Sequence, residues 1–121
     1  MAEEKSKRLK PMVITDPDTN HEYTLEFTRE SVRRCEAAGL DINLAASKSM
    51  TMIPLLFWGA FQARHPGMKQ SATYKILFEG LGGLNDQELE YLANLYAEPF
   101  KALIADAGEE EANPRKMTVS F

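Results

Sequence analysis

Residues 50–65, MTMIPLLFWGAFQARH, decide the fold. Wound as an α-helix of about 3.6 residues per turn, the stretch places Ile53 and Phe57 on one face and Leu55 and Trp58 on roughly the opposite side. A helix that is apolar on more than one face is normally enclosed by other elements. Its uncharged part is too short to cross a membrane, which takes ~20 apolar residues. The stretch therefore predicts a buried central helix.

The composition is that of a globular protein and lacks the excess of basic residues that nucleic-acid-binding proteins carry. The chain has 121 residues, is 44% hydrophobic and carries a net charge of -4, so no basic surface for nucleic acid is expected. A domain of this length buries about two thirds of its unfolded surface and needs no metal or disulfide to fold. Cys35 is the single cysteine, which excludes an intrachain disulfide. With no secretion signal or lipidation motif, we expect a cytoplasmic protein that does not enter a membrane.

The chain divides into two tails and one domain. Residues 1–9 are polar and charged without apolar periodicity, which predicts a disordered N-terminal tail. Residues 10–107 are expected to form a single helical domain that begins with a β-hairpin at 10–27. Residues 108–121 form a C-terminal tail. Its last five residues, MTVSF, have β character and are candidates for pairing with the hairpin.

The hairpin is predicted from two β-biased segments. KPMVIT (10–15) and HEYTLEF (21–27) flank DPDTN (16–20), which is rich in turn-forming residues. In the second segment Tyr23 and Leu25 alternate with polar residues, as in a half-buried strand. Two strands alone are marginally stable in water, so the hairpin must lie on the helices.

The remaining helices are marked by caps and breakers. Thr28 caps a surface helix that Gly39 ends, and a short helical turn is possible after Asp41. Ser49 or Thr51 would cap the central helix, with Pro54 in its first turn.

A later helix, capped by Ser71, carries an apolar face, and the last helix starts with a variant capping box formed by Asn85 and Glu88. Pro99 is expected to break the last helix near residues 97 and 98. The expected face of the Ser71 helix consists of Tyr74, Leu77, Phe78 and Leu81. The sequence thus predicts an α+β fold, mainly α, with four to five helices packed around the central apolar helix and an N-terminal β-hairpin.

The residue types that carry chemistry do not converge in the sequence. His21 and His65 lie in different elements, and neither has neighbours at metal-ligand spacing. Cys35 belongs to the inner stripe of its helix and has no base to activate it. The glycines at 80–83 close a helix, whereas phosphate-binding glycines open one. We therefore expect no catalytic residue, no cofactor and no metal, and a protein that is not an enzyme.

With no catalytic or metal site expected, the remaining functional hypothesis is a surface that binds another protein. Leu55, Trp58 and Gln62 are expected to lie off the main buried face of the central helix. Tyr91 and Leu95 flank the main stripe of the last helix. Aromatic anchors often dominate interfaces, so these five residues are the candidate protein-binding site. The alternative is that the hairpin or the helix containing Tyr74 covers Leu55 and Trp58.

Three segments together resemble the small tail assembly chaperones of long-tailed bacteriophages and prophages. They are YTLEFTRESVRRCEAAG (23–39), PLLFWGAFQARHPG (54–67) and ILFEGLGGLNDQELEYLANLYAEPF (76–100). The similarity covers roughly residues 13–104 and rests on helices and apolar positions.

The resemblance implies a mainly helical protein of the host cytoplasm that is absent from the mature virion. It implies binding to the tape measure protein and recruitment of tail tube subunits. Such proteins often have a longer product made by ribosomal frameshifting. Self-association into a homo-oligomer is also expected of exposed apolar surface. The alternatives are a head-to-tail connector or other small virion component, and a small enzyme or regulatory binding protein.

Overall fold

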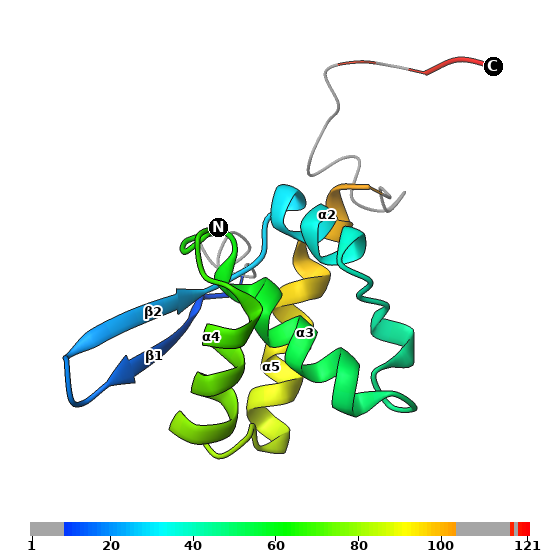
Figure 1. The fold of residues 1–121 in the computed structure, drawn as a ribbon. Helices are drawn as coiled ribbons and strands as arrows, with labels where there is room; N and C mark the ends of the chain where they lie inside the picture. Colours follow the sequence, from blue (N-terminus) through cyan, green and yellow to red (C-terminus); the bar gives the residue numbers. More distant parts are fainter. Residues whose placement is uncertain (1–8, 104–116, 118) are drawn as a thin grey trace.

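The computed structural model describes residues 9–103, 117 and 119–121. It confirms an α+β fold, mainly helical, with an N-terminal antiparallel hairpin and four α-helices around a shared core (Figure 1). The elements in chain order are β1 (Met12–Asp16), β2 (His21–Leu25), α2 (Arg29–Ala37), η1 (Ile42–Leu44), α3 (Ser49–Phe61), α4 (Gln70–Lys75), η2 (Ile76–Gly80), α5 (Asp86–Ala97) and η3 (Glu98–Ala102).

The hairpin forms where the alternating pattern predicts it. β1 and β2 pair antiparallel with Met12 opposite Leu25. The turn is closed by Asn20, whose φ of 60° is a conformation that Asn tolerates. The Asn20 amide donates to the Asp16 carbonyl at 2.7 Å, and the Asp16 carboxylate accepts from the Asp18 amide at 2.9 Å.

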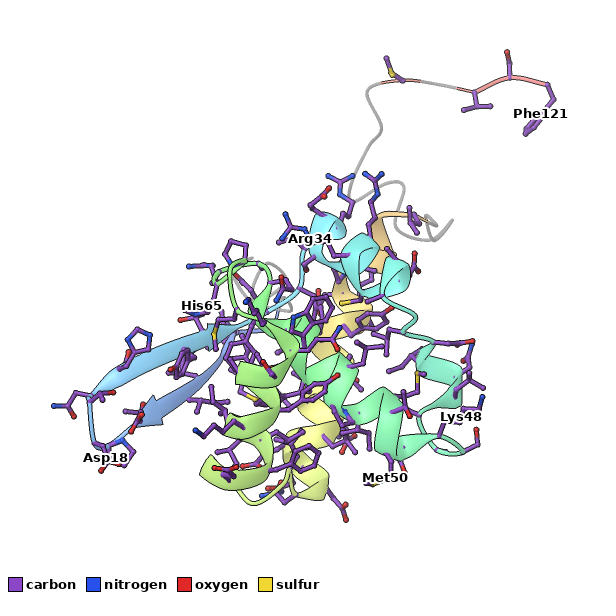
Figure 2. All side chains as sticks on the ribbon, viewed as in Figure 1. Asp18, Arg34, Lys48, Met50, His65 and Phe121 are labelled. Atoms are coloured by element: carbon purple, nitrogen blue, oxygen red, sulfur yellow. The ribbon has the colours of Figure 1, made fainter. Side chains whose placement is uncertain are left out.

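The outer edge of β2 is held by the end of α3. The Glu26 amide donates to the Ala60 carbonyl at 3.0 Å, and the Thr24 amide donates to Nε2 of His65 at 3.1 Å. His65, in the loop after α3, thus links the hairpin to the helical body (Figure 2). Leu25 is fully buried beside this junction.

Helix α3 is central, as predicted. It contacts β2, η1 and the helices α2, α4 and α5, so that apolar side chains on several of its faces are enclosed. Helix α2 approaches α3 closely where Cys35 meets Gly59. A Cβ added to Gly59 would lie 2.2 Å from Sγ of Cys35, so the two helices approach more closely than any other residue would allow.

The start of α3 differs from the prediction. The helix begins at Ser49, its N-cap is Lys48, and neither Ser49 nor Thr51 caps it. Pro54 therefore lies inside the helix rather than in its first turn. Proline removes the hydrogen bond to the carbonyl four residues earlier, that of Met50. Met50 itself is 83% exposed and lies at the surface, at the start of α3 (Figure 2).

The other predicted caps are largely confirmed. Thr28 caps α2 through the Ser31 amide, and Asp41 caps the short η1 turn. Asn85 and Glu88 form the capping box of α5. At Pro99 the α-helix changes into the 3₁₀ segment η3, as the predicted break requires. Ser71 does not cap α4, which begins one residue earlier, with Lys69 as its N-cap.

The predicted tails lie largely outside the described residues, at 1–8, 104–116 and 118. Leu9, which we assigned to the N-terminal tail, is half-buried and packs against the core. The described residues of MTVSF are exposed and belong to no strand, so the segment does not pair with its own hairpin in this structure.

Candidate protein-binding surface

The structure places three of the five predicted binding residues in the interior. Leu55, Gln62 and Leu95 are each no more than 5% exposed, so the expectation that they lie on the surface is wrong. The cause is the enclosure of α3, whose second apolar face packs on neighbouring helices instead of facing a partner.

Trp58 is half-buried, and its indole N–H has a hydrogen-bond partner within the protein. Its Nε1 donates to the Met68 carbonyl at 3.2 Å. The Gln62 side-chain amide donates to the same carbonyl at 3.2 Å. Both side chains therefore hold the loop between α3 and α4 against α3. The bonded partner is this loop, whereas the alternative considered for Trp58 named the hairpin or the helix containing Tyr74.

Tyr91 is half-buried and ties the N-terminal segment to α5. Its hydroxyl donates to the Lys10 carbonyl at 2.5 Å, across 81 positions of sequence. Because the hydroxyl has this partner, Tyr91 contributes to the attachment of the segment that leads into β1.

The exposed apolar surface lies instead on α4 and η2. Phe78 is 53% exposed and Leu81 40% exposed. Tyr74 lies one turn before Phe78, with its ring edge-to-face at a centroid distance of 6.4 Å. Large apolar side chains of this exposure normally have a partner when they cluster.

The sequence grouped Tyr74, Leu77, Phe78 and Leu81 on one apolar face. The structure buries Leu77, half-buries Tyr74 and exposes Phe78 and Leu81. The inward positions are Thr73 and Leu77, which are 0% and 3% exposed. Thr73 can be buried because its hydroxyl donates to the Gln70 carbonyl at 3.0 Å. The stripe from Tyr74 to Phe78 consequently faces outward.

η2 is a π-helical turn, in which the Leu81 amide donates to the Ile76 carbonyl five residues earlier, at 2.8 Å. The extra residue interrupts the α-helical period of about 3.6 on which the prediction relied. π-turns are rare and occur frequently at functional sites. Gly82 and Gly83, with φ of 69° and 100°, then end the element.

Two hollows border η2, one on the side of α3 and the other on the side of the hairpin. The first, which we name the Phe78 cleft, has a volume of about 170 Å³ and lies between the start of α3 and η2. It is lined by Ser49, Met50, Ile53, Pro54, Leu77, Phe78, Gly83 and Leu84. With one polar side chain among these, the cleft suits an apolar anchor from another protein.

The second hollow, which we name the hairpin groove, has a volume of about 630 Å³ and separates the hairpin from α4 and η2. Its apolar lining comes from Ile14, Tyr23, Met68, Ile76 and Leu81. Its charged lining is Asp16, Asp18, Lys75 and Glu79, two of which come from the hairpin turn and two from α4 and η2.

Two buried side chains in the described core, Cys35 and Tyr96, have raised pKa values. Burial, followed by the nearby charge of Glu36, raises the pKa of Cys35 to about 12. Burial, with smaller effects from Cys35, Glu36 and Asp41, raises the pKa of Tyr96 to about 12. Both groups are therefore protonated at neutral pH, and a protonated thiol is a poor nucleophile.

Within the described ranges, no three His, Cys, Asp or Glu side chains gather in a way that would hold a metal ion. In that same part of the chain, no helix has the length and apolar character needed to span a membrane.

Comparison with known proteins places the chain in a family. Neither the curated proteins nor the solved structures gave a match. A family model described as a domain of unknown function, DUF5055, matches residues 1–121, the full length of the sequence. The protein therefore belongs to the DUF5055 family.

Proposed function

We propose that this protein is a tail assembly chaperone of a long-tailed bacteriophage or prophage, which binds an apolar helical segment of the tape measure protein. The observation that carries the proposal is the Phe78 cleft together with the outward stripe of Tyr74 and Phe78. These residues expose on a helix the kind of apolar surface that a monomer normally buries.

The dimensions of the cleft favour a protein side chain over a small molecule. Drug-sized ligands occupy pockets of roughly 300–1,000 Å³, and the Phe78 cleft has about 170 Å³. Helix-in-groove recognition uses apolar anchors spaced one turn apart, each filling a small depression. One anchor would enter the cleft between Ile53 and Phe78, and the next would contact Tyr74 along the same helix.

Met50 adds adaptability to this surface. It is 83% exposed at the rim of the cleft, and its unbranched thioether side chain can repack against anchors of different shape. A chaperone for a long helical protein must bind several similar segments, so an adaptable rim suits the role. Binding would take place in the host cytoplasm, before tail tube subunits assemble, and the chaperone would be absent from the mature virion.

The test is co-expression with the tape measure protein encoded downstream. We expect wild-type protein to keep the tape measure protein soluble and to co-purify with it. Phe78→Ser should reduce the co-purified amount at least tenfold, because it removes the exposed wall of the cleft. The matched control is Leu103→Ser, which removes an apolar side chain of 69% exposure that directly follows η3 and does not line the cleft. This variant should bind as wild type.

Two outcomes would refute the proposal. The first is an insoluble tape measure protein with no complex. The second is equal binding by wild type and Phe78→Ser. Recovery of the protein from purified phage particles would instead favour a virion component.

A further inference from the structure

The two edges of the hairpin differ in what covers them. The Thr24 amide donates to His65, so it points away from β1. Thr24 lies opposite Val13, and in an antiparallel ladder both members of such a pair point their amides and carbonyls outward. At the outer edge of β2, the Thr24 amide is therefore bonded to His65, in the loop after α3, whereas β1 presents the backbone groups of Val13 and Thr15 at its outer edge. Within the described part of the chain no other segment bonds to them.

An open strand edge is a template for another strand. This edge also adjoins the hairpin groove, since Ile14, Thr15 and Asp16 of β1 all line it. A strand added to β1 would continue the sheet alongside the groove, and every second side chain would point toward the apolar lining formed with α4 and η2. The edge thus fits a short strand with apolar residues at alternate positions.

The last five residues of the chain have this pattern. In MTVSF, Met117, Val119 and Phe121 alternate with two hydroxyl residues, and the segment has the same length as β1. All three apolar residues are at least 63% exposed, and Figure 2 shows Phe121 well away from the helical body. An exposed segment with alternating apolar residues is complementary to an open strand edge.

The charges agree with this pairing. Arg115 and Lys116 directly precede the segment in the sequence. The groove carries three carboxylates, from Asp16, Asp18 and Glu79, against the single ammonium group of Lys75. A basic pair entering beside an excess of negative charge is favourable and hastens association.

We propose that the C-terminal segment MTVSF of one copy pairs with the outer edge of β1 of a second copy and places Val119 and Phe121 in its hairpin groove. Met117, Val119 and Phe121 are exposed in the single chain, so their apolar side chains are available to a second copy. Fourteen chain steps separate Leu103 from Met117, a reach of up to about 50 Å at ~3.3–3.6 Å per residue. Reciprocal exchange of the two segments closes a two-fold dimer. This self-association is independent of the Phe78 cleft.

The test measures the molar mass of the full-length protein by light scattering and sedimentation across micromolar concentrations. Wild type is expected to dimerise. The double variant Val119→Ser/Phe121→Ser should weaken the dimer at least tenfold. The control, Ser120→Ala, changes the opposite face of the added strand and should dimerise as wild type.

A second pair of variants tests the edge itself. Val13→Pro removes an amide that faces away from β2, so the hairpin is retained while pairing is blocked. Val13→Thr keeps the amide and is the control. Val13→Pro should dissociate the dimer, and Val13→Thr and Phe78→Ser should not.

Three outcomes would overturn the proposal. A wild type that is monomeric at every concentration would do so. So would a dimer that persists in both the Val119→Ser/Phe121→Ser and the Val13→Pro variants. A monomer whose hairpin NMR resonances move on substitution of Val119 and Phe121 would place the segment on its own hairpin.

Discussion

Gly59→Ala tests the close crossing of α2 and α3. The new Cβ would lie 2.2 Å from Sγ of Cys35 and 3.4 Å from Cε1 of Phe27. Cys35 is fully buried, so its sulfur cannot move aside into solvent. Overpacking of a core costs ~1–3 kcal/mol, and a contact this short belongs at the upper end. The better helix propensity of Ala returns about 1 kcal/mol. The free energy of unfolding should therefore fall by about 2 kcal/mol.

Urea unfolding followed by circular dichroism measures this change. With a slope of about 2 kcal/mol/M, the midpoint should fall by about 1 M. The double variant Cys35→Ala/Gly59→Ala removes the sulfur, and the nearest atom of residue 35 is then Cβ at 3.7 Å, an ordinary contact. The double variant should be less destabilised than the sum of the single variants. Gly67→Ala, whose Cβ would meet nothing within 4 Å, is the neutral control. A Gly59→Ala midpoint equal to wild type would refute the close crossing.

Three further predictions concern the core. Trp58→Phe removes the indole donor to the loop carbonyl and should lower the free energy of unfolding by about 1 kcal/mol in urea titration; no change would mean that the bond is unimportant. Tyr91→Phe should cost ~0.5–1.5 kcal/mol and shift NMR resonances of the N-terminal segment above all. Because burial raises the pKa of Cys35 and Tyr96 to about 12, their contribution to stability should be constant below about pH 8.5 and fall as the pH rises toward 12, since the unfolded chain releases these protons nearer ~8.5 and ~10. Stability unchanged at pH 11 would contradict the burial of these groups.

Local signals in the sequence predicted the architecture well. The alternation around Tyr23 and Leu25 identified the hairpin, and the caps at Thr28 and Asn85 located two helix starts. Each of these signals depends on neighbouring residues only. The length and hydrophobicity of α3 were sufficient to predict that it is central.

The exposed apolar surface on α4 and η2 could not be predicted because it depends on tertiary packing. On a helical wheel, Leu55 and Leu95 lie off the main apolar face, so their sequence positions suggest exposure. In the structure both side chains are buried. Phe78 looks buried by periodicity, yet Thr73 takes the inward position once its hydroxyl has a backbone partner. The π-turn at η2 has no simple sequence signal, although the glycines that follow indicate irregular geometry.

The most direct test of the central claim is site-specific photo-crosslinking in cells that make the tape measure protein. A photoreactive side chain is introduced at position 78, or at the exposed position 33 of α2 as the control. If the Phe78 cleft holds the partner helix, irradiation should crosslink the tape measure protein from position 78 and not from position 33. Equal yields at the two positions, or no crosslink at position 78 while the complex forms, would contradict the account.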